Sequence, residues 1–91
     1  MPETTLTIRA DVGLHARPAA VFVNTAKKFA CDVRVCHGEK EANAKSILGV
    51  LSLGVEQDDQ IVVRAEGEDA AEALEALTEL VEKNFELEEK E

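Results

Sequence analysis

Aromatic and basic residues are scarce in this sequence of 91 residues. It contains no tryptophan or tyrosine and three phenylalanines, and its 10 lysines and arginines are outnumbered by 19 aspartates and glutamates. Proteins that bind nucleic acids usually present a basic stripe and often stack bases on aromatic side chains. We therefore expect no DNA or RNA partner.

Long apolar runs are also missing. No stretch approaches the roughly 20 residues that a helix needs to cross a bilayer. The N-terminus, Met1-Pro2-Glu3, has neither the basic nor the apolar region of a signal peptide. The length is that of one domain. We therefore expect a cytoplasmic, monomeric protein that forms a single domain over residues 1–91 and does not insert into membranes.

There are only two cysteines, Cys31 and Cys36. They lie in one apparent strand an odd number of residues apart, so they point to opposite faces and cannot form a disulfide. Together with His37 they could suggest a metal site, but their spacing matches no zinc pattern and no fourth ligand is evident. We expect no metal and no other cofactor.

The net charge of −9 is carried by the C-terminal part of the sequence. Acidic and basic residues balance over residues 1–65, whereas residues 66–91 hold eleven acids against Lys83 and Lys90. Residues 9–28 have a local charge of +3. An anionic ligand would be tolerated near residues 9–28 and repelled from the C-terminal end.

The spacing of apolar residues predicts an α+β protein with one sheet. Alternation predicts strands over residues 4–10, 31–37, 40–43 and 60–65, and helical spacing predicts helices from Ala16 onward, over 47–53 and from 70 to about 83. A charged tail follows at residues 86–91. Helices on a single face of the sheet would bury the apolar stripes, and polar residues on the other face favour an antiparallel sheet. The predicted order is β-α-β-β-α-β-α.

Two of the predicted helices begin with a capping signal. Ser46 is expected to be the N-cap of the helix over residues 47–53, which Gly54 ends. Asp69 and Glu72 have the spacing of a capping box at the start of the last helix. In a capping box, each side chain accepts a hydrogen bond from the backbone amide of the other residue.

A histidine stands where the first strand gives way to the first helix. The free amides just past His15, those of Ala16 and Arg17, are expected to point outward at the positive end of the helix dipole, which is a geometry that binds phosphate. The Arg17 guanidinium can pair with phosphate oxygens. A neutral imidazole nitrogen can attack phosphorus, so the segment could accept a phosphoryl group on His15.

The residues alone leave a simpler interpretation of His15 open, because a single histidine before a helix is more often a surface or capping residue. The sequence also lacks a Ser-His-Asp set, a glycine-rich nucleotide loop and a pair of carboxylates in an apolar pocket. An autonomous enzyme is therefore not expected. A carrier whose partners supply the rest of the active site fits a chain of this size.

Two motifs carry a family resemblance. The segments GLHARPAA (residues 13–20) and KSILGVLSLG (residues 45–54) resemble the histidine-containing phosphocarrier (HPr) family of the bacterial sugar phosphotransferase system, over about residues 4–85. The resemblance implies an open-faced β-sandwich, a four-stranded antiparallel sheet with three helices on one face. It also implies that enzyme I phosphorylates His15 on Nδ1 with phosphate from phosphoenolpyruvate, that an EIIA domain of a sugar permease then receives the phosphoryl group, and that Arg17 is the active-site arginine.

Ser46 has two interpretations. As an N-cap it needs no further explanation. By resemblance it matches the regulatory serine that HPr kinase/phosphorylase modifies in some bacteria. A phosphate at a helix start is held by free amides, yet it adds about two negative charges next to the surface where partners would bind.

The helix over residues 47–53 carries more apolar residues than one face can bury. We expect two or three of them to lie in the core and Ile47, Leu48 and Leu51 to be exposed. With Ala16 and Ala20 these three form a candidate docking surface beside His15. In the HPr family, this is where enzyme I and EIIA bind.

Alternative functions remain within the resemblance. Relatives of HPr serve dihydroxyacetone kinase or a nitrogen-regulatory cascade with a similar histidine motif. A regulatory binding module acting through Ser46 and the helix over residues 47–53 is a further alternative. Regulatory paralogues that lack the histidine are excluded by the presence of His15.

Overall fold

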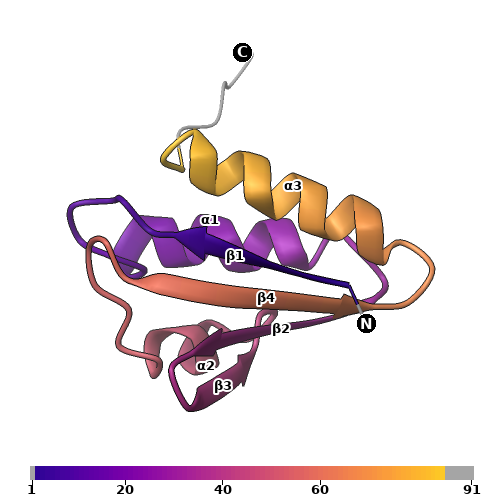
Figure 1. The fold of residues 1–91 in the computed structure, drawn as a ribbon, viewed down its shortest axis with the longest axis horizontal. Helices are drawn as coiled ribbons and strands as arrows, with labels where there is room; N and C mark the ends of the chain where they lie inside the picture. Colours follow the sequence, from indigo (N-terminus) through magenta and orange to yellow (C-terminus); the bar gives the residue numbers. More distant parts are fainter. Residues whose placement is uncertain (1, 86–91) are drawn as a thin grey trace.

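The computed structural model describes residues 2–85 as one antiparallel sheet covered by helices (Figure 1). Its strands are β1 (Glu3–Thr7), β2 (Asp32–His37), β3 (Lys40–Asn43) and β4 (Gln60–Glu66), and its helices are α1 (Ala16–Ala26), α2 (Ile47–Leu51) and α3 (Ala70–Glu82). The strand order is β1-β4-β2-β3. This arrangement confirms the predicted α+β class and the order of elements. The predicted tail at residues 86–91 lies outside the described residues.

The core lies between the sheet and the helices. Strands β2 and β4 alternate between buried and more exposed residues, and Val33, Val35, Ile61 and Val63 are each no more than 1% exposed. The helices contribute the apolar stripes that the sequence predicted, including the fully buried Phe22 of α1. No polar or charged residue between positions 2 and 85 is buried. Burial of apolar surface therefore holds the sheet and helices together.

Two elements are shorter than predicted. Strand β1 ends at Thr7 because its partner β4 begins at Gln60, opposite Thr7. The chain beyond Thr7 stays close to the sheet, since Ile8 N donates to Asp59 O at 2.9 Å. Helix α2 ends at Leu51 rather than at residue 53. Apolar residues just beyond these ends are buried all the same, so the periodicity reports burial better than it reports element boundaries.

The predicted capping box at the start of α3 is wrong. The side chain of Asp69 caps no amide of α3; its carboxylate accepts hydrogen bonds from Ala30 N at 2.9 Å and from Cys31 N at 3.0 Å. Two backbone amides in the segment before β2 offer the carboxylate a better site than the helix end does. Asp69 therefore ties the start of α3 to the start of β2.

The contacts of Asp69 predict a dependence of stability on pH. The amide of Ala30, the main cause, and the interactions with Cys31 lower the pKa of Asp69. A lowered native pKa stabilises the fold above the unfolded value of about 4, and that stabilisation is lost as pH falls through the native pKa. We expect Asp69→Asn to lower the melting temperature at neutral pH and to flatten its decline under acidic conditions.

Thermal unfolding followed by circular dichroism between neutral and acidic pH tests this expectation. The matched control is Asp32→Asn, which removes the same charge from an exposed position at the start of β2. Parallel stability profiles for the wild type and Asp69→Asn would contradict the role given to Asp69.

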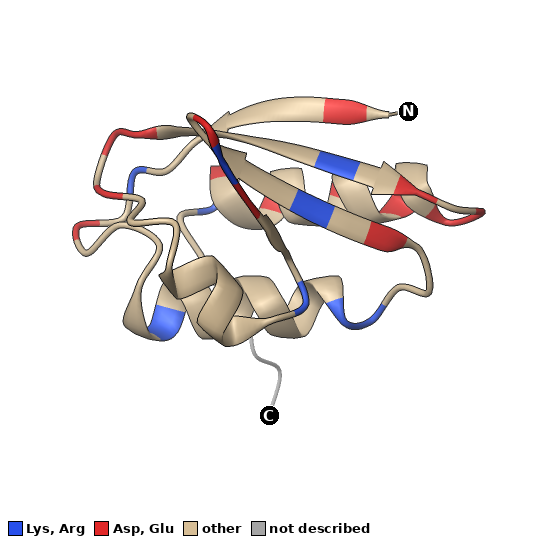
Figure 2. Ribbon diagram, turned by 90° about the horizontal axis from the view of Figure 1, so that it is seen from below, with Lys and Arg blue, Asp and Glu red and all other residues tan. Residues whose placement is uncertain are grey.

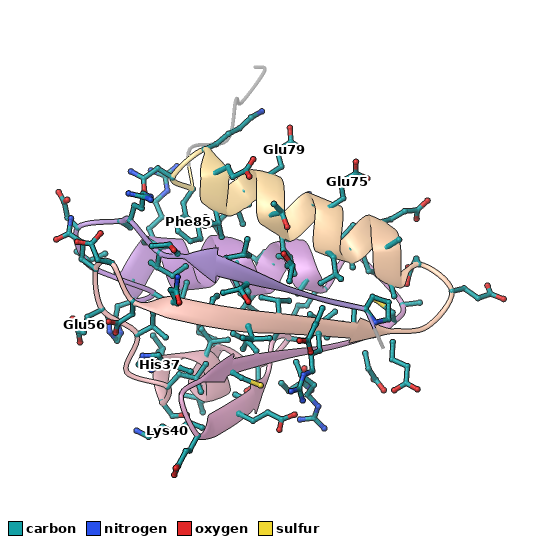
Figure 3. The ribbon with its side chains drawn as sticks, viewed as in Figure 1. His37, Lys40, Glu56, Glu75, Glu79 and Phe85 are labelled. Atoms are coloured by element: carbon teal, nitrogen blue, oxygen red, sulfur yellow. The ribbon has the colours of Figure 1, made fainter. Side chains whose placement is uncertain are left out.

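Four of the acidic residues in the C-terminal part lie on α3, at Glu72, Glu75, Glu79 and Glu82, and all four are among its exposed positions. Figure 2 shows acidic positions along α3 and basic positions at both ends of α1. Figure 3 shows Glu75 and Glu79 pointing away from the rest of the molecule, whereas Phe85, 5% exposed, turns beneath the helix end. The acidic side chains thus form a solvated face, which fits the predicted amphipathic helix.

None of the three helices described between residues 2 and 85 has the length and apolar character needed to span a membrane.

Both cysteines are free thiols. Cys31 is buried and Cys36 is half-buried, and burial, with a further contribution from Asp69, raises the pKa of the Cys31 thiol.

Candidate functional site

His15 is the last residue before α1, and the chain around it is firmly held. Its backbone is extended, with φ −132° and ψ 169°, and its side chain is 33% exposed. The preceding Leu14 is fully buried, and Leu14 N donates to Val55 O at 3.0 Å. The His15 ring is therefore accessible to a partner while its backbone is fixed to the core.

The first residue of α1 has an unusual backbone conformation. Ala16 has a φ of 53°, in the left-handed region that residues other than glycine rarely adopt. The sequence predicted a regular helix start and missed this turn. A left-handed residue next to a right-handed one brings successive amides into a concave, anion-binding arrangement. The amides of Ala16 and Arg17 are placed to form such an arrangement.

Arg17 and Pro18 complete the start of α1. Arg17 is exposed, so its guanidinium is free to meet a ligand or partner from solvent. Pro18 lies in the first turn, where a missing N–H leaves no helical hydrogen bond unmade. The exposed Arg17 thus follows the half-buried His15 at the start of α1, and a joint action of the two on a phosphate stays a prediction.

A carboxylate that sequence reasoning did not include lies next to the His15 ring. Glu56 Oε2 is 3.6 Å from His15 Nε2, and its side chain is 71% exposed. Glu56 lies in the turn before β4, far from His15 in sequence, so no local spacing could reveal the contact. The only hint is Gly13, which allows the two backbones to approach: a Cβ at position 13 would be 2.3 Å from Val55 O.

The turn that carries Glu56 is cross-linked to its surroundings. Asp59 Oδ2 accepts a hydrogen bond from Glu56 N at 2.9 Å and lies 3.2 Å from His37 Nε2. The other nitrogen of His37, Nδ1, is 2.8 Å from Leu53 O. Figure 3 shows His37 below and to the right of Glu56. The contacts of His37 in the structure thus hold this turn.

Helix α2 supports the predicted N-cap and the predicted division of its apolar residues. Ser46 Oγ accepts a hydrogen bond from Gly49 N at 3.1 Å, which confirms the N-cap. Val50 and Leu53 are buried. The residues expected to be exposed are Ile47 at 40%, Leu48 at 76% and Leu51 at 36%.

Helix α2 packs against α1, and on α1 Ala16 and Ala20 are exposed. We call the exposed residues Ile47, Leu48, Leu51, Ala16 and Ala20 the apolar patch.

Comparison with known families settles where the chain belongs. Residues 2–83 match the family model described as the PTS HPr component phosphorylation site, where PTS denotes the phosphotransferase system. The chain belongs to the HPr family. It is an HPr phosphocarrier of the phosphotransferase system, a protein that relays phosphoryl groups rather than an autonomous enzyme.

Solved HPr structures share the fold over almost the whole chain. HPr-C-His from Thermoanaerobacter tengcongensis is 49% identical, with a TM-score of 0.92 and coverage of 93% of this chain and 96% of that chain. The phosphocarrier protein HPr from Bacillus anthracis is 41% identical, with a TM-score of 0.85 and coverage of 88% and 95%. Crh, the catabolite repression protein of Bacillus subtilis, is 40% identical, with a TM-score of 0.73 and coverage of 96% and 100%.

Proposed function

We propose that His15 carries the phosphoryl group of this HPr phosphocarrier, on Nδ1. It receives the group from enzyme I, which obtains it from phosphoenolpyruvate, and passes it to an EIIA domain of a sugar permease. The observation that carries the proposal is the position of His15: an accessible ring immediately before the left-handed Ala16, whose amide opens the helix. We also propose that the protein is cytoplasmic, where it would meet enzyme I and the EIIA domain, and that residues 1–91 form a single domain.

The surroundings of His15 suit phosphoryl transfer with little further chemistry. A nitrogen lone pair of the ring bonds to phosphorus while the bond from phosphorus to the donor atom breaks, and negative charge is spread over the three phosphoryl oxygens. The amides of Ala16 and Arg17, the helix dipole and the Arg17 guanidinium stabilise that charge. The partner supplies the donor or acceptor group, so the chain needs no catalytic base of its own.

Locating the added phosphate tests the proposal. The protein is incubated with enzyme I and labelled phosphoenolpyruvate, and the modified residue is identified by mass spectrometry under alkaline conditions. We expect an acid-labile, base-stable phosphoryl group on His15. A phosphoryl group attached to any other residue would overturn the assignment.

Arg17 provides a more specific prediction about phosphate stabilisation. We expect Arg17→Glu to slow phosphoryl transfer from enzyme I by about 10- to 100-fold, because a carboxylate would replace a guanidinium beside the incoming anion. The stability should change by less than about 0.5 kcal/mol, since Arg17 is exposed. Stopped reactions with labelled phosphoenolpyruvate measure the rate, and thermal unfolding measures the stability.

Lys28→Glu is the matched control for Arg17→Glu. It reverses an exposed positive charge beyond the other end of α1. Equal slowing by the two variants would indicate a general effect of charge and would contradict a direct role of Arg17.

The apolar patch is proposed as the surface on which enzyme I and EIIA dock. An exposed apolar cluster close to the reacting residue is the usual centre of a binding interface. Leu48, 76% exposed, is the most prominent member of this patch. A hydrophobic contact there would hold the partner in place while the phosphoryl group moves between the two proteins.

The similarity to Crh favours a second, regulatory role for Ser46. Crh is a catabolite repression protein of 40% identity. We propose Ser46 as a site for HPr kinase/phosphorylase. Ser46 is half-buried at the start of α2, next to Ile47 of the apolar patch. A phosphate there would place negative charge at the edge of the docking surface.

A further inference from the structure

The two nitrogens of the His15 ring have different neighbours. Nε2 faces Glu56 Oε2 at 3.6 Å, a separation too long for a hydrogen bond but within the range of an ion pair. Nδ1 is the atom to which the proposed function assigns the phosphoryl group. The carboxylate of Glu56 therefore faces the nitrogen that does not react.

The backbone on both sides of this pair is fixed. Glu56 N donates to Asp59 Oδ2 at 2.9 Å, and Asp59 N donates to Glu56 O at 3.0 Å. The residue before Glu56 accepts the hydrogen bond from Leu14 N. The ring of His15 and the carboxylate of Glu56 thus extend from two segments that are joined by a backbone hydrogen bond. This hydrogen bond keeps the two side chains close to each other.

We propose that Glu56 is a positioning residue that keeps the Nε2 proton on the His15 ring throughout the phosphoryl cycle. The inference rests on the proposed function of His15. In a neutral imidazole, one nitrogen carries the hydrogen and the other carries the lone pair. A carboxylate beside Nε2 favours the hydrogen there, and this leaves the lone pair on Nδ1 for attack on phosphorus.

The charge of the ring changes during each transfer. The Nδ1 lone pair forms the bond to phosphorus while the bond from phosphorus to the donor atom breaks, and the electron pair of that bond stays with the donor. Since Nε2 keeps its proton, the phosphorylated ring is a cation, and Glu56 supplies the opposite charge. When the phosphoryl group leaves for the next acceptor, the electron pair of the N–P bond returns to Nδ1. The ring is then neutral again, and no proton has entered or left it.

Retention of the proton has a consequence for the onward transfer. A protonated ring departs from phosphorus as neutral imidazole, whereas an unprotonated ring would have to depart as an anion. Glu56 therefore increases the rate at which the phosphorylated protein donates its phosphoryl group. Because the Glu56 side chain is 71% exposed, its effect should be modest and should weaken at high salt.

The test compares Glu56→Gln with Glu75→Gln. Glutamine keeps the shape of the side chain and removes its charge, and Glu75 is an exposed glutamate on the outer side of α3 (Figure 3). Each protein is labelled with ¹⁵N-histidine and phosphorylated by enzyme I and phosphoenolpyruvate. Nitrogen chemical shifts at one neutral pH then give the ratio of Nε2-protonated to unprotonated phosphohistidine.

We expect Glu56→Gln to lower this ratio about two- to five-fold and to slow spontaneous loss of the phosphoryl group by a similar factor. Glu75→Gln should match the wild type, and Glu56→Asp, which keeps the charge, should restore part of the ratio. Identical spectra and loss rates for Glu56→Gln and Glu75→Gln, with phosphate still on His15, would refute the role of Glu56 and leave the proposed function intact. Phosphate found on another residue of the wild type would refute both.

Discussion

His15→Ala is expected to reduce phosphoryl transfer from enzyme I by at least about 100-fold, to the limit of detection, because the variant lacks the proposed nucleophile. Folding should be almost unaffected. The His15 side chain is 33% exposed and its ionic contact is with an exposed carboxylate, so we expect a change in the free energy of unfolding below about 0.5 kcal/mol. Labelled phosphoenolpyruvate measures the transfer, and urea unfolding measures the stability.

His37→Ala is the matched control, because the sequence has two histidines. The His37 ring contacts Leu53 O and Asp59, and it lies in the turn network rather than at the start of α1. This variant should lose stability but still accept a phosphoryl group. Transfer that persists in His15→Ala and disappears in His37→Ala would reverse the assignment of the two histidines.

Gly13→Ala is expected to destabilise the protein by about 2 to 4 kcal/mol, which corresponds to a fall in melting temperature of roughly 10 to 25 °C. Gly13 has a φ of 72°, and an added Cβ would lie 2.3 Å from Val55 O and 2.8 Å from Glu56 Cα. These neighbours are backbone atoms that cannot rotate away. The two segments must separate, which weakens the hydrogen bond from Leu14 N and moves Glu56 away from His15.

Gly54→Ala separates the steric effect from the conformational one. Gly54 has a similar φ of 67°, but nothing lies within 4 Å of the position that its Cβ would take. It should therefore show only the cost of a left-handed alanine, about 1 kcal/mol. Calorimetric melting temperatures of the two variants provide the comparison. Equal losses would show that the close approach at Gly13 contributes nothing.

The sequence was sufficient to predict the order of the elements and the apolar stripes that face the core. Alternation in β4 and helical spacing in α1 and α3 report directly on burial, and the N-cap at Ser46 is a contact within four residues. The start of α1 directly after His15 was likewise predicted, whereas a joint role of His15 and Arg17 stays a prediction. These features depend on neighbours in the sequence, and local patterns therefore describe them.

The features that the sequence did not predict depend on contacts between distant segments. Asp69 has the right spacing for a capping box, yet it bonds to amides 38 and 39 residues away. Glu56 reaches His15 only because the turn before β4 lies against the segment before α1. Nothing in the local sequence distinguishes Ala16 from an ordinary first residue of a helix. Tertiary packing decided all three.

The hydrogen bond from Leu14 N to Val55 O also has a consequence for folding during synthesis on the ribosome. It fixes the backbone just before His15 to a residue that the ribosome adds much later. A nascent chain that has released α1 but not yet the turn before β4 has His15 without its anchor. We therefore expect the chain to become a competent acceptor only late in translation, once the turn before β4 has emerged.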